Sequence, residues 1–409
     1  MNGSKSIRIA VLTDFHAYAG RPGDKVASPS WLDLSKVQSD PGLNAFTGLL
    51  DTIKATSGMT ADVVLCCGDL GDKADPAGQQ YVWSEVEKVR VALGAKLTLG
   101  AAGNHDVDSR YIYSGFDAKG HIQALKPGFP VDSEKGWLEY WAKNFTIVEI
   151  DDVRFVLLNS AAYHGAAKEG QPPEYVHGRV SDHTIGRLVA ELKNDGERKA
   201  NVLVCHHHPF KNDKVTVSDY SQMQNGDKLI NDLVEAEIGP WLVIHGHKHE
   251  GRLFYAGGNN YPTVFAAASF SAKPYPDQPR QTFNEFYIVE LEIPEDLGEV
   301  ASLLGTILTW SWSYGAGWRR PQVNEGMGPR AGFGARVDIG ALAKQIATAL
   351  RRDHAGKPVS WSLVETEHGY VSHLVPEELA GLILRLGKHH NLGITRDNDF
   401  GQIAEVQVR

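Results

Sequence analysis

The sequence has few cysteines and no long hydrophobic run. Its three cysteines, Cys66, Cys67 and Cys205, are odd in number and lack the Cys-x-x-Cys spacing of zinc and redox motifs. They supply no disulfide framework, and they favour reduced thiols in a cytoplasmic protein. No stretch approaches the roughly 20 apolar residues that cross a bilayer, so the sequence predicts no membrane contact.

The sequence also has fewer basic than acidic residues. The chain has 41 Lys and Arg against 50 Asp and Glu, a formal net charge of −9. This balance disfavours a protein that coats nucleic acid, because such binding depends on Lys and Arg that neutralise phosphates. A nucleic-acid substrate stays an open alternative. The first apolar stretch, residues 7–12, is too short for a signal peptide and predicts a strand.

The length predicts more than one domain. Single cores stop growing beyond roughly 250–300 residues, and the chain has 409. Strand-like and helix-like segments alternate in the first part, which predicts an α/β domain over residues 1–312. The Gly-, Pro- and Arg-rich residues 313–336 predict a linker or irregular crossover. Residues 337–409 predict a small C-terminal α+β domain of open role.

Hydrophobic spacing predicts the individual elements. Short apolar runs predict strands at residues 6–13, 62–67, 96–101, 145–150, 153–158, 201–205, 241–245, 263–268 and 286–293. Helical spacing predicts helices at residues 43–53, 81–93, 182–192, 339–350 and 376–386. Two further strands are predicted at residues 359–364 and 402–408.

Polar segments directly follow five of the predicted strands. They are Asp14-Phe15-His16, Gly68-Asp69-Leu70-Gly71-Asp72, Gly103-Asn104-His105-Asp106, His206-His207-His208-Pro209 and Gly246-His247-Lys248-His249. Ligands of α/β sheets bind at this end of the strands. Carboxylate, imidazole and carboxamide groups without a thiolate suit Mn, Fe, Zn, Ni or Co. Each segment alone is common at strand ends, but the five in this order predict a metal site.

The spacing within the segments supports this prediction. Alternate residues of an extended segment point to the same side, so Asp14 with His16 and His247 with His249 form two converging pairs. Glycines precede three of the candidate ligands, where they let the backbone turn sharply and approach a metal closely.

The ordered motifs resemble the calcineurin-like metallophosphoesterase superfamily, whose pattern is DxH, GDxxD, GNH(D/E), a His near a Pro, and GHxH. The resemblance covers about residues 6–293. The GNHD and GHxH segments look closer to the branch of cyclic-nucleotide and glycerophosphodiester phosphodiesterases than to the Ser/Thr protein phosphatases. The resemblance implies a four-layer α/β sandwich of two mixed sheets flanked by helices.

The resemblance also implies two divalent metal ions, with Mn²⁺ as the first choice and Fe, Zn, Ni or Co as alternatives. The implied ligands of the first ion are Asp14, His16, His249 and Asp69. The implied ligands of the second ion are Asn104, His207, His247 and the shared Asp69.

One departure from the family pattern affects this assignment. The usual His-His-Pro-Pro appears here as His206-His207-His208-Pro209-Phe210. Counting back from the proline, which fixes the turn, selects His207, whereas counting from the strand end selects His206. We predict His207 as the ligand.

The resemblance implies that His105 faces the substrate and that Asp106 orients it. Two ions clamp the attacking and leaving oxygens of an in-line displacement, and bound water becomes acidic near pH 7. His105 then stabilises charge or protonates the leaving alkoxide. A purely structural role as a loop tether is the alternative.

Substrate contacts are less determined by the sequence. Asn159, His164 and His208 are candidates for lining the cleft. Aromatic residues between Asp106 and Phe145 either stack on a nucleobase or form a small core under the loop, and the small core is favoured. Arg319 and Arg320 could reach a phosphate, but a solvated basic linker is the simpler interpretation.

The predicted function is hydrolysis of a small or nucleotide-like phosphodiester in the cytoplasm. A phosphomonoesterase and a DNA or RNA nuclease of the same superfamily are the alternatives. A metal- and nucleotide-binding sensor or scaffold, whose C-terminal domain recruits a protein partner, is an alternative of another class. The complete set of candidate ligands argues against the last of these.

Overall fold

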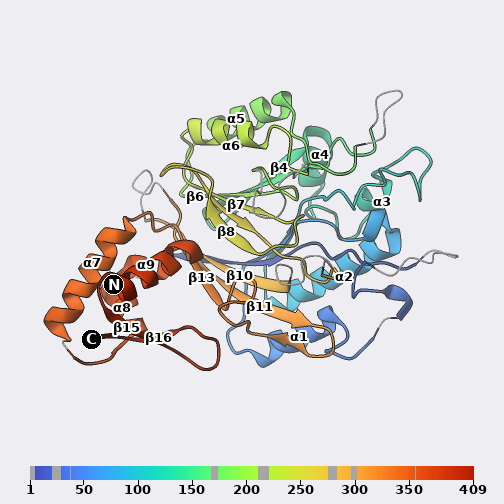
Figure 1. The fold of residues 1–409 in the computed structure, drawn as a ribbon. Coiled ribbons are helices and arrows are strands. Elements are labelled where there is room, and N and C mark those ends of the chain that lie inside the picture. The colour runs from blue at the N-terminus through green and yellow to red at the C-terminus, as the bar shows by residue number, and fades with distance from the viewer. Residues whose placement is uncertain are drawn as a thin grey trace.

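The computed structural model describes residues 5–20, 29–36, 38–166, 174–210, 221–274, 283–295, 302–354 and 356–409. Two mixed sheets stack face to face, with helices on the outer face of each (Figure 1). Helices α1 (Ala45–Ala55) and α2 (Pro76–Leu93) cover the first sheet. Helices α5 (Asp182–Asp195) and α6 (Gly226–Glu235) cover the second. The predicted four-layer α/β arrangement is confirmed.

The first sheet has the strand order β12-β11-β10-β1-β2-β3, and β13 also pairs with β11. Its strands are β1 Ser6–Leu12, β2 Val63–Cys66, β3 Leu97–Gly100, β10 Asn284–Glu292, β11 Gly305–Ser313, β12 Gly317–Arg319 and β13 Arg330–Phe333. The central strands β1, β2 and β3 are parallel, and their last residues Leu12, Cys66 and Gly100 lie in one row. The polar segments that follow these strands therefore start at the same edge of the sheet.

The second sheet has the order β4-β5-β6-β7-β9-β8. Its strands are β4 Phe145–Ile150, β5 Val153–Leu158, β6 Ala200–Val204, β7 Trp241–His245, β8 Arg252–Tyr255 and β9 Thr263–Ala266. The strands β5, β6, β7 and β9 are parallel, and Leu157, Val204 and Ile244 share a row near their ends. The polar segments that follow β6 and β7 therefore also start at one edge of this sheet.

The inner strands are apolar on both faces because each face packs against another layer. Phe155 and Val202 pack between the two sheets, whereas their neighbours Val156 and Leu203 pack under α5 and α6. Ser181 begins α5 as predicted, since its side chain accepts the N–H of Thr184. Shorter helices connect these layers: α3 Gly120–Gln123, α4 Glu134–Lys143, η1 Leu34–Lys36 and η2 Asp72–Ala74.

The C-terminal residues form a small unit with its own sheet, β14-β16-β15. Its elements are α7 Ile339–Asp353, β14 Val359–Ser360, α8 Trp361–Glu367, η3 Gly369–His373, α9 Pro376–Lys388, β15 Leu392–Arg396 and β16 Ile403–Val408. Ile346, Leu382 and Val406 are fully buried in a separate hydrophobic cluster. The unit contacts the first sheet through β13, where the Ala335 N–H donates to the His373 carbonyl at 3.1 Å.

Two local predictions were wrong. The stretch 313–336, predicted as a linker or crossover, contains β12 and β13, which both pair with β11. Within 359–364 only the first two residues are a strand, because the Ser360 side chain accepts the Leu363 N–H and starts α8. The division of the chain into domains stays a prediction. No helix in the described ranges is long and apolar enough to cross a bilayer.

Candidate metal centre

The five polar segments meet between the C-terminal ends of the two sheets. Asp14 and Asp69 follow strands of the first sheet, whereas His206 and His249, which reach them across the seam, follow strands of the second. The Asp14 carboxylate accepts the main-chain N–H of His247 at 3.0 Å and lies 3.2 Å from His249 Nε2. The Asp69 carboxylate lies 3.3 Å from His206 Nε2. The site thus spans the seam between the sheets.

Asp69 lies at the centre of the candidate ligands and is buried. Its Oδ2 atom lies 3.5 Å from His16 Nε2 and 3.3 Å from His206 Nε2. Its Oδ1 atom accepts the His105 main-chain N–H at 2.7 Å. One carboxylate oxygen therefore faces imidazoles on both sides, as a ligand shared by two cations must.

The first group of candidate ligands is Asp14, His16 and His249. The two imidazole Nε2 atoms lie 3.1 Å apart, and Asp14 Oδ1 lies 3.2 Å from the His249 nitrogen and 3.9 Å from the His16 nitrogen. All three side chains are buried. Nitrogen and oxygen atoms that converge so closely in a buried position suit a divalent cation between them.

The second group is Asn104, His206 and His247. Asn104 Oδ1 lies 3.2 Å from His206 Nε2 and 3.1 Å from His247 Nδ1, and these two nitrogens lie 3.2 Å apart. His206 Nδ1 lies 2.7 Å from the Cys67 carbonyl oxygen, which can only accept. Nδ1 therefore donates there, and Nε2 is the nitrogen that can bind a cation.

The structure places His206, not the predicted His207, beside Asn104 and Asp69. His207 Nδ1 instead lies 2.8 Å from Ser160 Oγ, and its Nε2 has no hydrogen-bond partner among the described residues. His207 still offers a ligand atom within 4.8 Å of those of His206 and His247. Of the three histidines, His206 is nearest to the end of β6, so counting from the strand end selects the ring beside Asn104 and Asp69.

Backbone strain is concentrated in these segments. Five candidate ligands adopt the left-handed conformation with positive φ: Asp14 (54°), His16 (50°), Asp69 (54°), His247 (78°) and His249 (54°). Such a conformation costs roughly 1–3 kcal/mol for a residue other than glycine and clusters at functional sites. A Cβ atom on Gly103 would collide with the Asp69 carboxylate, so the close approach requires glycine there.

The buried charges interact strongly. Burial raises the pKa of the Asp69 carboxyl, but the imidazoles of His206 and His105 outweigh this and hold it well below its usual range. Burial and the neighbouring His105 lower the pKa of His16 to about 3, which keeps this ring neutral and able to coordinate. Burial lowers the pKa of His206, but Asp69 raises it more, to about 9. A cation there must displace a proton from His206.

His105 pairs with a different carboxylate from the predicted one. Its Nδ1 lies 3.0 Å from Asp72 Oδ1. Burial lowers the pKa of the His105 imidazole, but the Asp69 and Asp72 carboxylates raise it more, so the net pKa lies above its usual value. Asp72 is the second Asp of the GDxxD segment, and its sequence position alone predicts no role for it.

Asp106, predicted to orient His105, holds the backbone instead. Its two oxygens accept the N–H groups of Asp69, Leu70 and Gly103 at 2.7–2.8 Å. Burial and the charge of Asp69 raise its pKa to about 7. The chain turns at residues 104–106, which points the Asp106 side chain back under the loop. Asp106 therefore ties the second polar segment to the third.

Of the three predicted substrate residues, His208 lies beside the second group and His164 lies beside the neighbouring His207. The His164 ring lies 5.3 Å from that of His207, and the His208 ring stacks on that of His247 at 5.7 Å. Burial lowers the pKa of His164 to about 4. Asn159 is buried, and its side-chain oxygen has no hydrogen-bond partner in the described part of the chain.

The aromatic residues before Phe145 divide into two sets. Phe129 is fully buried, and its ring contacts those of Trp83 and Tyr140, as expected for a small core under the loop. Tyr111 and Phe116 are instead exposed, at 40% and 92%. Arg319 pairs with Glu325 at 2.8 Å on the far edge of the first sheet.

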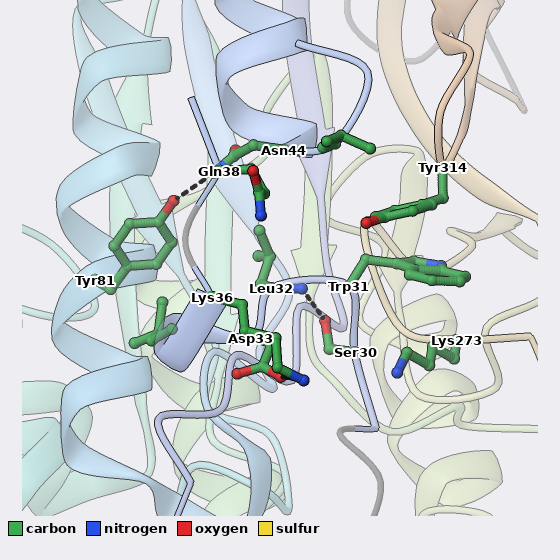
Figure 2. A pocket seen from close by; sticks show the side chains of 12 residues that line it. Ser30, Trp31, Leu32, Asp33, Lys36, Gln38, Asn44, Tyr81, Lys273 and Tyr314 are labelled. Carbon is green, nitrogen blue, oxygen red and sulfur yellow. Dashed lines mark hydrogen bonds and ion pairs between the residues drawn. The ribbon is translucent and has the colours of Figure 1, made fainter. Parts of the chain in front are cut away.

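A pocket of about 220 Å³ opens beside α1 and α2 (Figure 2). Tyr81 lines it on one side, and the stacked rings of Trp31 and Tyr314 line it on the other, with ring centroids 4.6 Å apart. None of its lining residues is a candidate ligand. Its lining residues connect to the first polar segment through the Leu32 carbonyl, which accepts the Tyr18 N–H, and through the Ser30 hydroxyl, which donates to the Phe15 carbonyl.

A fold of two helix-flanked mixed sheets, with converging Asp, Asn and His side chains at their seam, defines a metal-dependent phosphoesterase. The chain belongs to the calcineurin-like phosphoesterase family, whose model matches residues 7–251, more than half of its length. The family supports two divalent ions, and four groups of His and Asp residues in the described ranges can hold a metal.

Several solved structures are similar to the chain. A dimetal phosphatase from Danio rerio is 13% identical, with a TM-score of 0.44, over 76% of this chain and 98% of that one. PhoD is 11% identical (TM-score 0.40, 78% and 72%), and a 5′-nucleotidase from Candida albicans is 12% identical (TM-score 0.35, 71% and 49%). No match was found among curated proteins.

Proposed function

We propose that the chain hydrolyses phosphoesters at a dinuclear metal centre. The proposed ligands are Asp14, His16, Asp69, Asn104, His206, His247 and His249. The observation that carries the proposal is the position of Asp69 Oδ2, within 3.5 Å of imidazole nitrogens from both groups. Mn²⁺ is the first ion to test, because the oxygen and nitrogen ligand set suits it, and Fe, Zn, Ni and Co follow.

We propose His206 as the ligand of the second ion, in place of the His207 predicted from the sequence. Three contacts support it: those of His206 Nε2 with Asp69, Asn104 and His247, all at 3.2–3.3 Å. The hydrogen bond from Nδ1 to the Cys67 carbonyl fixes the ring in the orientation typical of a metal-ligating histidine. His207 is then a neighbour of the centre.

Two divalent ions bound here would neutralise phosphoryl charge and make a water molecule available as hydroxide near neutral pH. His105 is the proposed acid. Its Nδ1 faces Asp72, so Nε2 is the nitrogen left for the leaving oxygen of the ester. Asp72 holds the ring in place and stabilises its protonated form, while Asp106 fixes the loop that carries it.

The motif resemblance favours a small or nucleotide-like phosphodiester as substrate, with a phosphomonoester and a nucleic acid as alternatives. A sensor or scaffold that recruits a protein through its C-terminal unit is the alternative of another class. A cytoplasmic location is a separate proposal. It is supported by the three cysteines, which are free and buried.

The test supplies Mn²⁺ to the full chain and assays bis(p-nitrophenyl) phosphate and p-nitrophenyl phosphate. Metal content per chain is measured on the same preparation. The proposal expects about two metal ions per chain and turnover of at least one substrate. Two bound metals without turnover of either ester would favour the scaffold. One metal ion per chain with full activity would contradict the dinuclear centre.

A further inference from the structure

Arg110 lies on the loop that follows His105, and its charge is not neutralised by a described acid. The side chain is exposed. Its guanidinium lies over the ring of Tyr175, 4.5 Å from the centroid, and no ion pair joins it to a carboxylate within the described ranges. An exposed cation that rests on an aromatic face keeps its hydrogen-bond donors available.

Tyr175 connects this cation to the candidate metal centre. Its carbonyl oxygen accepts a hydrogen bond from Asn104 Nδ2 at 3.4 Å, and Asn104 is a proposed ligand. Arg110 is therefore linked to the proposed ligand Asn104 through a single intervening residue.

The loop that carries Arg110 is held firmly. The buried carboxylate of Asp108 accepts the N–H groups of Ile112, Tyr113 and Ser114 at 2.7–2.9 Å. The Tyr111 hydroxyl donates to the Gly165 carbonyl at 2.5 Å. The backbone next to Arg110 therefore needs little further ordering when a ligand binds.

The acid nearest to Tyr175 in the sequence has other partners. Glu174 pairs with Arg179 at 3.2 Å and with His177 at 3.1 Å. These contacts direct its carboxylate to its own segment and leave the positive charge of Arg110 available. A phosphate can therefore bind to Arg110, because the planar guanidinium can donate two parallel hydrogen bonds to two phosphate oxygens.

We propose that Arg110 binds an anionic oxygen of the substrate's phosphoryl group. A phosphomonoester dianion offers three non-bridging oxygens that share two negative charges, whereas a diester offers two that share one. Arg110 therefore favours phosphomonoester dianions and the product phosphate. This inference rests on the proposed function and sharpens it, since it selects the monoester among the substrate classes left open by the motifs.

The test compares the Mn²⁺-loaded full chain with its Arg110→Gln variant. Binding of inorganic phosphate, measured by calorimetry, should weaken about tenfold, the scale of one charge-assisted hydrogen bond. The kcat/KM for p-nitrophenyl phosphate should fall about tenfold, and that for bis(p-nitrophenyl) phosphate should change less than twofold. Arg110→Lys keeps the positive charge but lacks the planar, bidentate guanidinium, so its phosphate affinity and kcat/KM should lie between those of the wild type and Arg110→Gln.

The matched control is Arg319→Gln, which removes an arginine far from the site and should leave all three values unchanged. Metal content and the thermal unfolding midpoint are measured for each variant, so that a folding defect is recognised. Equal losses for both esters, or unchanged phosphate binding, would overturn the role of Arg110. Failure of the wild type to hydrolyse either ester would instead overturn the proposed function, because phosphate binding does not depend on turnover.

Discussion

The two groups of candidate ligands on either side of Asp69 are held in different ways. In the first group Asp14, His16 and His249 all have left-handed backbones. In the second group only His247 does. The other two members of the second group use their non-ligating atoms, with hydrogen bonds from His206 Nδ1 to Cys67 and from Asn104 Nδ2 to Tyr175.

This difference separates two ways of positioning a ligand. The first group depends mainly on the path of the chain, which the surrounding fold must hold against its intrinsic preference, and Asp14 is also held by hydrogen bonds from Thr13 and the His247 N–H. The second group depends on individual hydrogen bonds that orient each side chain. The first group should therefore respond to changes in the turns, and the second to changes in single partners.

Asp69→Asn tests whether the two groups act as one centre, and it should have the largest effect. The substitution removes the shared negative charge from both groups. We expect loss of both metal ions and nearly complete loss of turnover, measured by elemental analysis and by the phosphoester assay. Two bound metals with wild-type turnover would show that Asp69 does not join the groups.

His206→Ala tests the membership of the second group. It should lose one metal equivalent, whereas His207→Ala and His208→Ala should keep both. Elemental analysis of the three purified variants decides between them. Loss of metal only in His207→Ala would restore the ligand predicted from the sequence.

The histidine run also shows where the sequence stops being informative. The strand ends and the five polar segments were readable, because apolar runs and their polar ends are local features. Three consecutive residues of one type carry no local signal that selects the inward ring. That choice depends on how β6 lies against the segment of Asn104, which is a long-range relation.

The same limit explains the other differences. The strands β12 and β13 are short and exist through their pairing with β11, so their own sequence shows little alternation. The roles of Asp72 and Asp106 depend on a turn that reverses the chain after His105. Both carboxylates lie in the expected motifs, but the contact predicted for Asp106 is made by Asp72.

His105→Ala separates catalysis from metal binding in both groups. We expect both metal ions to stay and turnover to fall roughly 10²–10⁴-fold, the usual contribution of a general acid. The loss should be larger for an alkyl leaving group than for p-nitrophenolate, which scarcely needs a proton. Equal losses for the two leaving groups would mean that His105 stabilises phosphoryl charge.

Asp72→Asn should have the smallest effect and sharpen the assignment of the acid. Asp72 raises the pKa of His105, so its removal lowers that pKa. The alkaline limb of the activity profile, where His105 loses its proton, should move to lower pH by roughly one unit. The acid limb should stay in place. An unchanged alkaline limb in the full pH profile would contradict the pairing of Asp72 with the catalytic proton.

His16 and His249 lie 233 positions apart in the sequence, yet their nitrogens are 3.1 Å apart. The unfolded chain retains only the local ligand pairs, so the complete centre exists only in the folded state. Metal affinity therefore adds directly to the free energy of unfolding, by about 2.7 kcal/mol when free metal is 100-fold above its dissociation constant. Scarcity of metal should then shorten the lifetime of the folded protein in a cell, and lower its abundance together with its activity.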